Sequence, residues 1–229
     1  MKNIIVTGAS GNLGRSVTRK FIDKGYQVIA TVIHEDAKNE LGQSKNLQTE
    51  IVNLVNEQET NSFMARMLDK YKKIDAAIML AGGFTAGDIY STTMDDIRKQ
   101  ISLNFETAYH LTRPLFQHMI QNNYGRLIYT GARPALRPDA GKDLVAYSFA
   151  KSMLFNLASY LNEEARGRNV TATVIVPSTI DTPVNRQFMP DANPESWVKP
   201  EDIAGVLDFM LSDNASALRE TVLKIYNNA

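Results

Sequence analysis

The pair of residues with the clearest chemical use in this sequence is Tyr147 and Lys151. In a helix, residues four apart lie on one face, so the phenol and the ammonium would stand one turn apart. A nearby ammonium stabilises the phenolate and lowers the pKa of a tyrosine. We therefore expect Tyr147 to exchange a proton with a substrate near neutral pH, assisted by Lys151. The alternative is a surface helix with a packed tyrosine and a solvated lysine, and the rest of the chain decides between the two.

The composition excludes several classes of function. The 229 residues include 25 basic and 25 acidic side chains with no block of like charge, which argues against a nucleic-acid or membrane-surface partner. There is no cysteine, and His34, His110 and His118 are far apart, so we expect no disulfide and no metal site. No apolar run is long enough to span a bilayer. The sequence predicts a soluble, cytoplasmic protein that acts on a small molecule.

A glycine-rich turn follows the first predicted strand, residues 2–6, and precedes a helical pattern over residues 15–24. Strand, glycine turn and helix form the context of a dinucleotide-binding fingerprint. Gly8 would permit the tight turn, Gly11 would admit a pyrophosphate, and Gly14 would let helix and strand pack closely. Amide groups at the helix start would face the phosphates. The residues expected at the cofactor are Gly8, Ser10, Gly11, Asn12, Leu13 and Gly14.

Strands and helices alternate along the whole chain. Further strands are expected over residues 27–33, 47–54, 74–80, 126–130, 170–176 and 222–226. Helices are expected over residues 57–72, 92–121 with a break near Arg113 and Pro114, 147–166 and 200–211. The proline-rich segment Asp181–Pro200 reads as a loop with at most short helices. This order predicts one α/β domain over residues 1–229, with a doubly wound parallel sheet covered by helices on both faces.

Taken in order, these motifs resemble the short-chain dehydrogenase/reductase family over nearly the whole chain. The resemblance implies a Rossmann-type fold and an oxidoreductase that uses NAD(H) or NADP(H). It makes Tyr147 the general acid/base, Lys151 the group that holds the ribose, and Asn104 the anchor of a water linked to Lys151. Other residues that the resemblance places at the cofactor are Asn53, Leu54, Ala81, Gly82, Pro177, Ile180 and Thr182, the last at the nicotinamide carboxamide.

One position departs from the family pattern in a way that bears on the substrate. The active-site serine of the family falls at Ala132, which has no hydroxyl to polarise a carbonyl. Thr130 or a downstream group could substitute, the substrate could need no such bond, or the enzyme could be impaired. The third case leads to an alternative function, a cofactor-binding sensor or scaffold with little turnover.

The dihydropteridine reductases, one branch of the family, also carry alanine at this position. They resemble the present sequence at residues 81–84, 131–136 and 181–190, continuing to Ser196 and Trp197. The resemblance implies transfer of hydride to a small carbonyl or to a conjugated imine of the quinonoid pterin type. A shared scaffold with a different substrate is the alternative. The residues expected at the substrate are Phe84, Ala132, Arg133 and Arg186.

The choice between NAD and NADP is read at the end of the second strand. An acidic residue there favours NAD, and this sequence has Ile33 instead. Arg15 could meet a 2′-phosphate, whereas Glu35 and Asp36 would oppose it. The balance favours NADP.

Two further expectations concern movement and assembly. The loop Asp181–Pro200 should act as a lid, with Phe188, Met189 and Trp197 as bulky groups over a flat substrate ring. The alternative, which applies to Trp197 above all, is a fixed surface loop whose aromatic residues cap the core. The helices over residues 92–121 and 147–166 should pair with a partner's copies in a homodimer or homotetramer. They carry more apolar residues than one sheet face needs, among them Leu111, Leu115, Phe116, Met119, Met153, Leu154, Leu157 and Leu161.

Overall fold

The computed structural model describes residues 1–219 and 222–228. Its centre is a seven-stranded sheet in the order β3-β2-β1-β4-β5-β6-β7, in which all neighbouring strands are parallel. The strands are β1 (Asn3–Thr7), β2 (Gln27–Val32), β3 (Leu47–Ile51), β4 (Ala76–Met79), β5 (Gly125–Thr130), β6 (Val170–Pro177) and β7 (Val222–Ile225). The predicted α/β fold with a doubly wound parallel sheet is confirmed.

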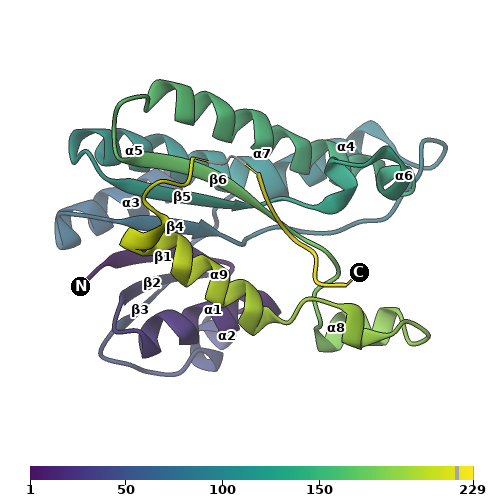
Figure 1. Cartoon of the computed structure of the whole chain (residues 1–229), viewed down its shortest axis with the longest axis horizontal. Helices are drawn as coiled ribbons and strands as arrows, with labels where there is room; N and C mark the ends of the chain where they lie inside the picture. The colour runs from purple at the N-terminus through teal and green to yellow at the C-terminus, as the bar shows by residue number, and fades with distance from the viewer. Residues whose placement is uncertain (220–221, 229) are drawn as a thin grey trace.

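Helices cover the sheet on both faces, as Figure 1 shows. The α-helices are α1 (Asn12–Asp23), α2 (Glu35–Glu40), α3 (Glu57–Tyr71), α4 (Met94–Ile101), α5 (Thr107–Gln121), α6 (Pro138–Gly141), α7 (Val145–Glu164), α8 (Pro183–Phe188) and α9 (Pro200–Leu211). One apolar core lies between the sheet and α3, α5 and α7, and the other lies between the sheet and α1 and α9. Strands buried on both faces explain the continuous β-branched runs of the sequence, such as the fully buried β6.

The interruption expected near Pro114 lies elsewhere. Helix α5 runs through Pro114, while a π-helical turn over Ser102–Glu106 separates it from α4. The side-chain amide of Asn104 donates to the carbonyl of Gln100, four residues earlier, and so occupies an acceptor of the helical ladder. At Pro114 only one backbone donor is missing, and the buried Leu111 and Leu115 on either side hold the helix against the core.

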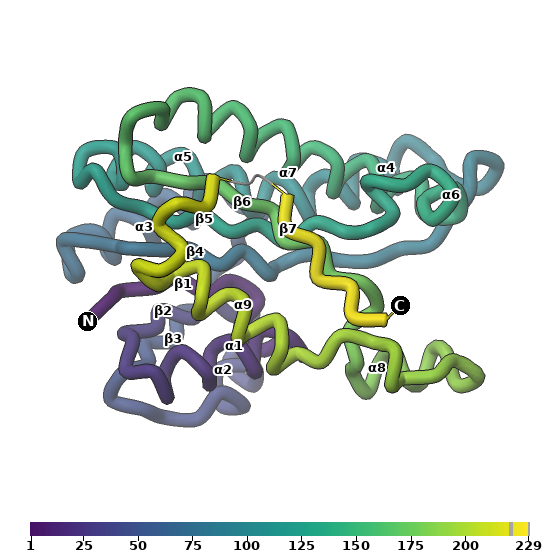
Figure 2. Tube along the Cα trace, viewed as in Figure 1, coloured from purple at the N-terminus to yellow at the C-terminus, as the bar shows by residue number. Residues whose placement is uncertain are grey.

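The carboxyl ends of the strands form the edge at which functional groups gather. The chain leaves β1 toward β2 on one side and returns through β4 on the other, so the sheet has a switch point between β1 and β4. The segment after β6 carries α8 away from the sheet, and the C-terminal segment after β7 runs toward α8 (Figure 2). There the amide of Asn227 donates to the carbonyl of Trp197 at 2.9 Å, which ties the two segments together.

Candidate active site

The glycine turn between β1 and α1 leaves no room for side chains. Gly8 has φ +60°, and a Cβ there would lie 2.9 Å from the backbone nitrogen of Ala81 at the end of β4. A Cβ on Gly14 would lie 2.1 Å from the carbonyl oxygen of Gly8. Helix α1 starts after Gly11 with no side-chain cap and no acidic residue in its first turn. Its first amide groups are therefore available to an anion, and the turn fits a pyrophosphate.

A cavity of about 320 Å³ opens beside this turn, at the switch point of the sheet. Seven of the residues expected at the cofactor line it, namely Gly8, Ser10, Gly11, Asn53, Leu54, Ala81 and Gly82. Asn12, Leu13 and Gly14 lie in the adjoining first turn of α1. The size and the apolar walls of the cavity, together with the uncapped helix, fit a nucleotide.

The end of β2 contributes Ile33, which is 76% exposed and lines the same cavity. Arg15 lies close by, with Nε donating to the carbonyl of Ser10 at 2.6 Å and Nη2 paired with Glu40 at 2.6 Å. The acidic residue that faces Arg15 is therefore Glu40 and not Glu35 or Asp36, for which no ion pair with Arg15 occurs among the described residues.

Tyr147 and Lys151 come from the first two turns of α7, which begins beside the chain after β4. The backbone N–H of Val145 donates to the carbonyl of Gly87 at 2.9 Å, and this bond fixes the start of the helix. The ring of Phe84 packs edge-on against Tyr147 with centroids 5.2 Å apart. Lys151 is only 5% exposed, and its Nζ donates to the carbonyl of Thr130 at 2.7 Å, at the end of β5. Tyr147 is thus no surface residue, and Lys151 is no solvated one.

Burial moves the pKa of both groups toward their neutral forms. It raises the pKa of Tyr147 to about 12 and lowers the pKa of Lys151 to about 8. The expectation that Lys151 lowers the pKa of Tyr147 therefore does not hold in this structure. The Lys151 Nζ lies 5.8 Å from the centre of the Tyr147 ring and donates to a backbone carbonyl, and burial is the one cause of the raised pKa of Tyr147.

Asn104 lies in the π-helical turn and fastens the chain after β4. Its Oδ1 accepts from the N–H of Gly83 at 3.2 Å, and its Nδ2 donates to the carbonyl of Gly83 at 3.0 Å. A Cβ on Gly82 would lie 2.5 Å from Asn104 Oδ1 and 3.5 Å from Lys151 Nζ. Gly82 therefore faces both polar groups without a side chain between them.

A second cavity, of about 500 Å³, lies in front of Tyr147. Of the residues expected at the substrate or nicotinamide, it is lined by Phe84, Ala132, Arg133, Tyr147, Pro177 and Ile180. The methyl group of Ala132 forms part of the wall where the family carries a hydroxyl. The hydroxyl oxygen of Thr130 is buried and has no hydrogen-bond partner in the described part of the chain.

Three expected site residues lie outside this cavity. Thr182 caps α8, its hydroxyl accepting from the N–H of Asn185 at 3.1 Å, and its O–H remains able to donate. The guanidinium of Arg186 is held by both carboxylate oxygens of Asp181 at 2.6 and 2.8 Å, so it is no free cation at the substrate. Trp197 is 5% exposed and packs into the protein, which contradicts its expected role as a mobile lid group.

The remaining residues expected at the lid or at a subunit interface differ in whether they are exposed or buried. Phe188 is 79% exposed, and Met189 lines the second cavity. Leu111, Leu115, Met119 and Leu154 are buried in the core under α5 and α7, so they are not surplus apolar residues. The apolar side chains that these two helices do expose are aromatic, namely Tyr109, Phe149 and Tyr160.

Some residues of the site were missed by the sequence analysis. Thr7, in the last position of β1, accepts from the N–H groups of Leu80 and Ala81 at 3.1 and 3.0 Å, and so joins the ends of β1 and β4. Ser178, Thr179 and Asn185 line the cavity in front of Tyr147. The first two belong to the segment 177–182 that the resemblance places at the nicotinamide, but they were not singled out as site residues. Their positions after the last residue of β6 were the available signal, because such residues lie at the carboxyl edge of the sheet.

Within the described ranges 1–219 and 222–228, no cluster of histidine, aspartate and glutamate could hold a metal ion. In the same ranges no helix is both long and apolar enough to cross a membrane.

Comparison with known proteins agrees with this geometry. The family model described as short chain dehydrogenase matches residues 2–193. The dihydropteridine reductase of Dictyostelium discoideum is 28% identical, with 94% of this chain and 90% of that protein covered. The 3-oxoacyl-(acyl-carrier-protein) reductase of Rickettsia felis is 27% identical, with 94% and 91% covered. Among solved structures, the serine dehydrogenase of Escherichia coli superimposes with a TM-score of 0.83 at 22% identity, covering 97% of this chain and 96% of its own.

Proposed function

This chain belongs to the short-chain dehydrogenase family and is an NAD(P)-dependent oxidoreductase; on that premise we propose that it reduces a small conjugated imine or carbonyl, with Tyr147 as the proton donor. When bound, the nicotinamide supplies the hydride. The proton comes from the Tyr147 hydroxyl, which lines the cavity of about 500 Å³ and, with its pKa raised to about 12, is fully protonated at neutral pH. In the reductive direction a protonated phenol is the form that the reaction needs.

The observation that carries the choice of acceptor is Ala132. A buried methyl group replaces the second hydrogen-bond donor, and the hydroxyl oxygen of Thr130, a residue that also lines this cavity, is itself buried in the structure. An acceptor whose conjugated system already disperses the developing charge needs only the donor on Tyr147. We therefore favour a quinonoid imine of the pterin type over an isolated ketone. The 28% identity to a dihydropteridine reductase supports this choice.

In this proposal Lys151 holds the ribose hydroxyls and Thr182 the nicotinamide carboxamide. A water anchored by Asn104 links Lys151 to solvent and returns a proton to the site. The glycine turn binds the pyrophosphate. Arg15 binds the 2′-phosphate of NADP and so makes the enzyme prefer NADP over NAD. The enzyme works as a cytoplasmic homo-oligomer. The sensor alternative suggested by Ala132 gains no support from the relatives named above, whose names are those of reductases and a dehydrogenase.

The test is Tyr147→Phe, assayed by NADPH oxidation with a quinonoid dihydropterin, 1,2-quinones and dicarbonyls. We expect kcat to fall at least about 100-fold, since a positioned general acid contributes that much. Cofactor affinity, measured by NADPH fluorescence, should stay within about threefold, because the phenol proton is needed only for chemistry. Near-normal kcat in the variant would refute the role of Tyr147. Equal rates of the wild type on the dicarbonyls and the dihydropterin would refute the preferred acceptor.

A further inference from the structure

The cavity in front of Tyr147 contains one formally charged residue among those that line it, and that residue is Arg133. The other lining groups are apolar or neutral, such as Leu144, Met189 and Asn185. Arg133 directly follows Ala132 and opens a short 3₁₀ turn, so its backbone is fixed beside the proposed site of reduction. It is half-buried. A charge in such a place interacts more strongly with a ligand than a charge in bulk water does.

The guanidinium of Arg133 has no hydrogen-bond acceptor in the part of the chain that the structure describes. It takes part in no ion pair and no side-chain hydrogen bond among the described residues, and its one recorded interaction is with the ring of Tyr226, 5.6 Å away. The backbone of Tyr226 is anchored, because the Ser178 hydroxyl donates to its carbonyl at 2.8 Å. The aromatic contact stabilises the cation without providing an oxygen for its N–H groups.

Other arginines near the site are satisfied. Arg137 donates to both oxygens of Asp139, and Arg186 to both oxygens of Asp181. Both of these lie outside the cavity lining. The arginine that lines the cavity is thus the one that lacks a carboxylate, and a planar guanidinium is suited to bind an oxyanion through two parallel hydrogen bonds.

We infer that the substrate carries an oxyanion, such as a carboxylate or sulfonate, and that Arg133 binds it. The inference rests on the proposed function in one respect, namely that this cavity is the substrate cavity. It narrows the acceptor to an anionic conjugated imine or carbonyl and makes Arg133 a specificity-determining residue.

The test uses two matched pairs of ligands on the full-length protein. For turnover, 1,2-naphthoquinone is compared with its 4-sulfonate. For binding without turnover, 2-naphthalenesulfonate is compared with the neutral 2-naphthalenesulfonamide by calorimetry on the NADP⁺-loaded protein. Arg133→Met removes the charge and keeps an apolar stem. Arg137→Met is the control, because Arg137 is an arginine four residues away, paired with Asp139 and outside the cavity.

We expect Arg133→Met to lower the affinity for the sulfonate, and kcat/KM for the sulfonated quinone, by about tenfold or more. The neutral partner of each pair should change by less than about threefold, and Arg137→Met should change neither. If Arg133→Met loses the preference for the sulfonate in binding while the wild type reduces none of the acceptors, the proposed reaction is refuted and the anion site is supported. Normal quinone reduction with the same sulfonate affinity in wild type and Arg133→Met, or no binding of the sulfonate to wild type at millimolar concentration, would overturn the inference.

Discussion

Replacing Lys151 by methionine should make the free protein more stable at neutral pH while abolishing its activity. Lys151 is 5% exposed, and burial lowers its pKa from 10.5 to about 8. One pKa unit corresponds to about 1.4 kcal/mol, so keeping this ammonium charged in the folded state costs about 3 kcal/mol at pH 7. The hydrogen bond to the Thr130 carbonyl, lost in the variant, offsets about 1–2 kcal/mol. A net stabilisation of about 1–2 kcal/mol remains.

The sign of the pH dependence identifies the cause. Because the folded-state pKa lies below the unfolded one, the unfolded chain binds more protons between about pH 8 and pH 10.5. The wild type therefore gains stability as the pH rises through this window, and its penalty falls below about 1 kcal/mol by pH 10. The methionine variant has no such group. Its advantage should be present at pH 7 and should vanish or reverse at pH 10.

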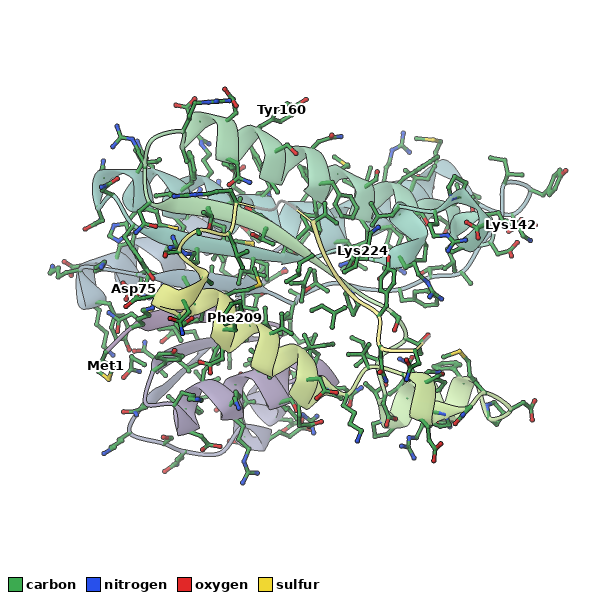
Figure 3. All side chains as sticks on the ribbon, in the orientation of Figure 1. Met1, Asp75, Lys142, Tyr160, Phe209 and Lys224 are labelled. Atoms are coloured by element: carbon green, nitrogen blue, oxygen red, sulfur yellow. The ribbon has the colours of Figure 1, made fainter. Side chains whose placement is uncertain are left out.

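The assay is thermal unfolding followed by circular dichroism at both pH values. For a chain of this length the net gain corresponds to a rise in Tm of roughly 2–8 °C at pH 7. Lys142→Met is the control, because Lys142 lies at the outer surface near α6, paired with Asp143 (Figure 3). A methionine variant that is no more stable than wild type at pH 7, or whose advantage is the same at pH 10, would refute a buried ammonium at this position.

Three further outcomes are expected. Glu40→Gln should free Arg15 and lower Kd for NADPH about fivefold, which is the equivalent of an exposed ion pair of about 1 kcal/mol, and Kd for NADH should stay unchanged. An equal change in Kd for both cofactors would show that Arg15 does not bind the 2′-phosphate. Chymotrypsin should cleave after the exposed Phe188 in the free protein and much more slowly with NADP⁺ and substrate bound; equal rates would mean that the 181–200 segment is no lid. Light scattering at micromolar concentration should give at least twice the chain mass of 25.5 kDa, and a monomer mass would refute the oligomer.

The order of strands and helices could be predicted from the sequence because it depends on local patterns. The β-branched run of β1, the turn at Gly8 and the helical period of α1 each specify their own structure. The glycine positions also carry steric information, since a Cβ at Gly14 would meet backbone at 2.1 Å whatever the rest of the chain does. Fold class and the cofactor turn could therefore be assigned without the structure.

The parts that could not be predicted depend on side-chain geometry and burial in the folded chain. The break before α5 comes from the side chain of Asn104, which hydrogen-bonds to the carbonyls of Gln100 and Gly83. The residue types around Asn104 do not predict these bonds. Arg186 is paired with Asp181, which competes with any substrate for the guanidinium. The sequence contains both residues, but it does not show that they form an ion pair. The direction of the Tyr147 pKa shift depends on burial, which helical spacing does not report.

The strand order also has a consequence for how the chain acquires its structure. β1 pairs with β2 on one edge and with β4 on the other, with Ile4 opposite Ala76, so one side of the first strand stays unpaired until the chain has been made past residue 79. During synthesis the β3-β2-β1 half therefore exposes an open strand edge, a hazard for aggregation that parallel folds share. The cofactor turn lies on that same edge, and its back wall is Ala81. A nicotinamide dinucleotide can therefore stabilise the protein only after β4 has docked, so it acts on a nearly complete fold and does not nucleate the nascent one.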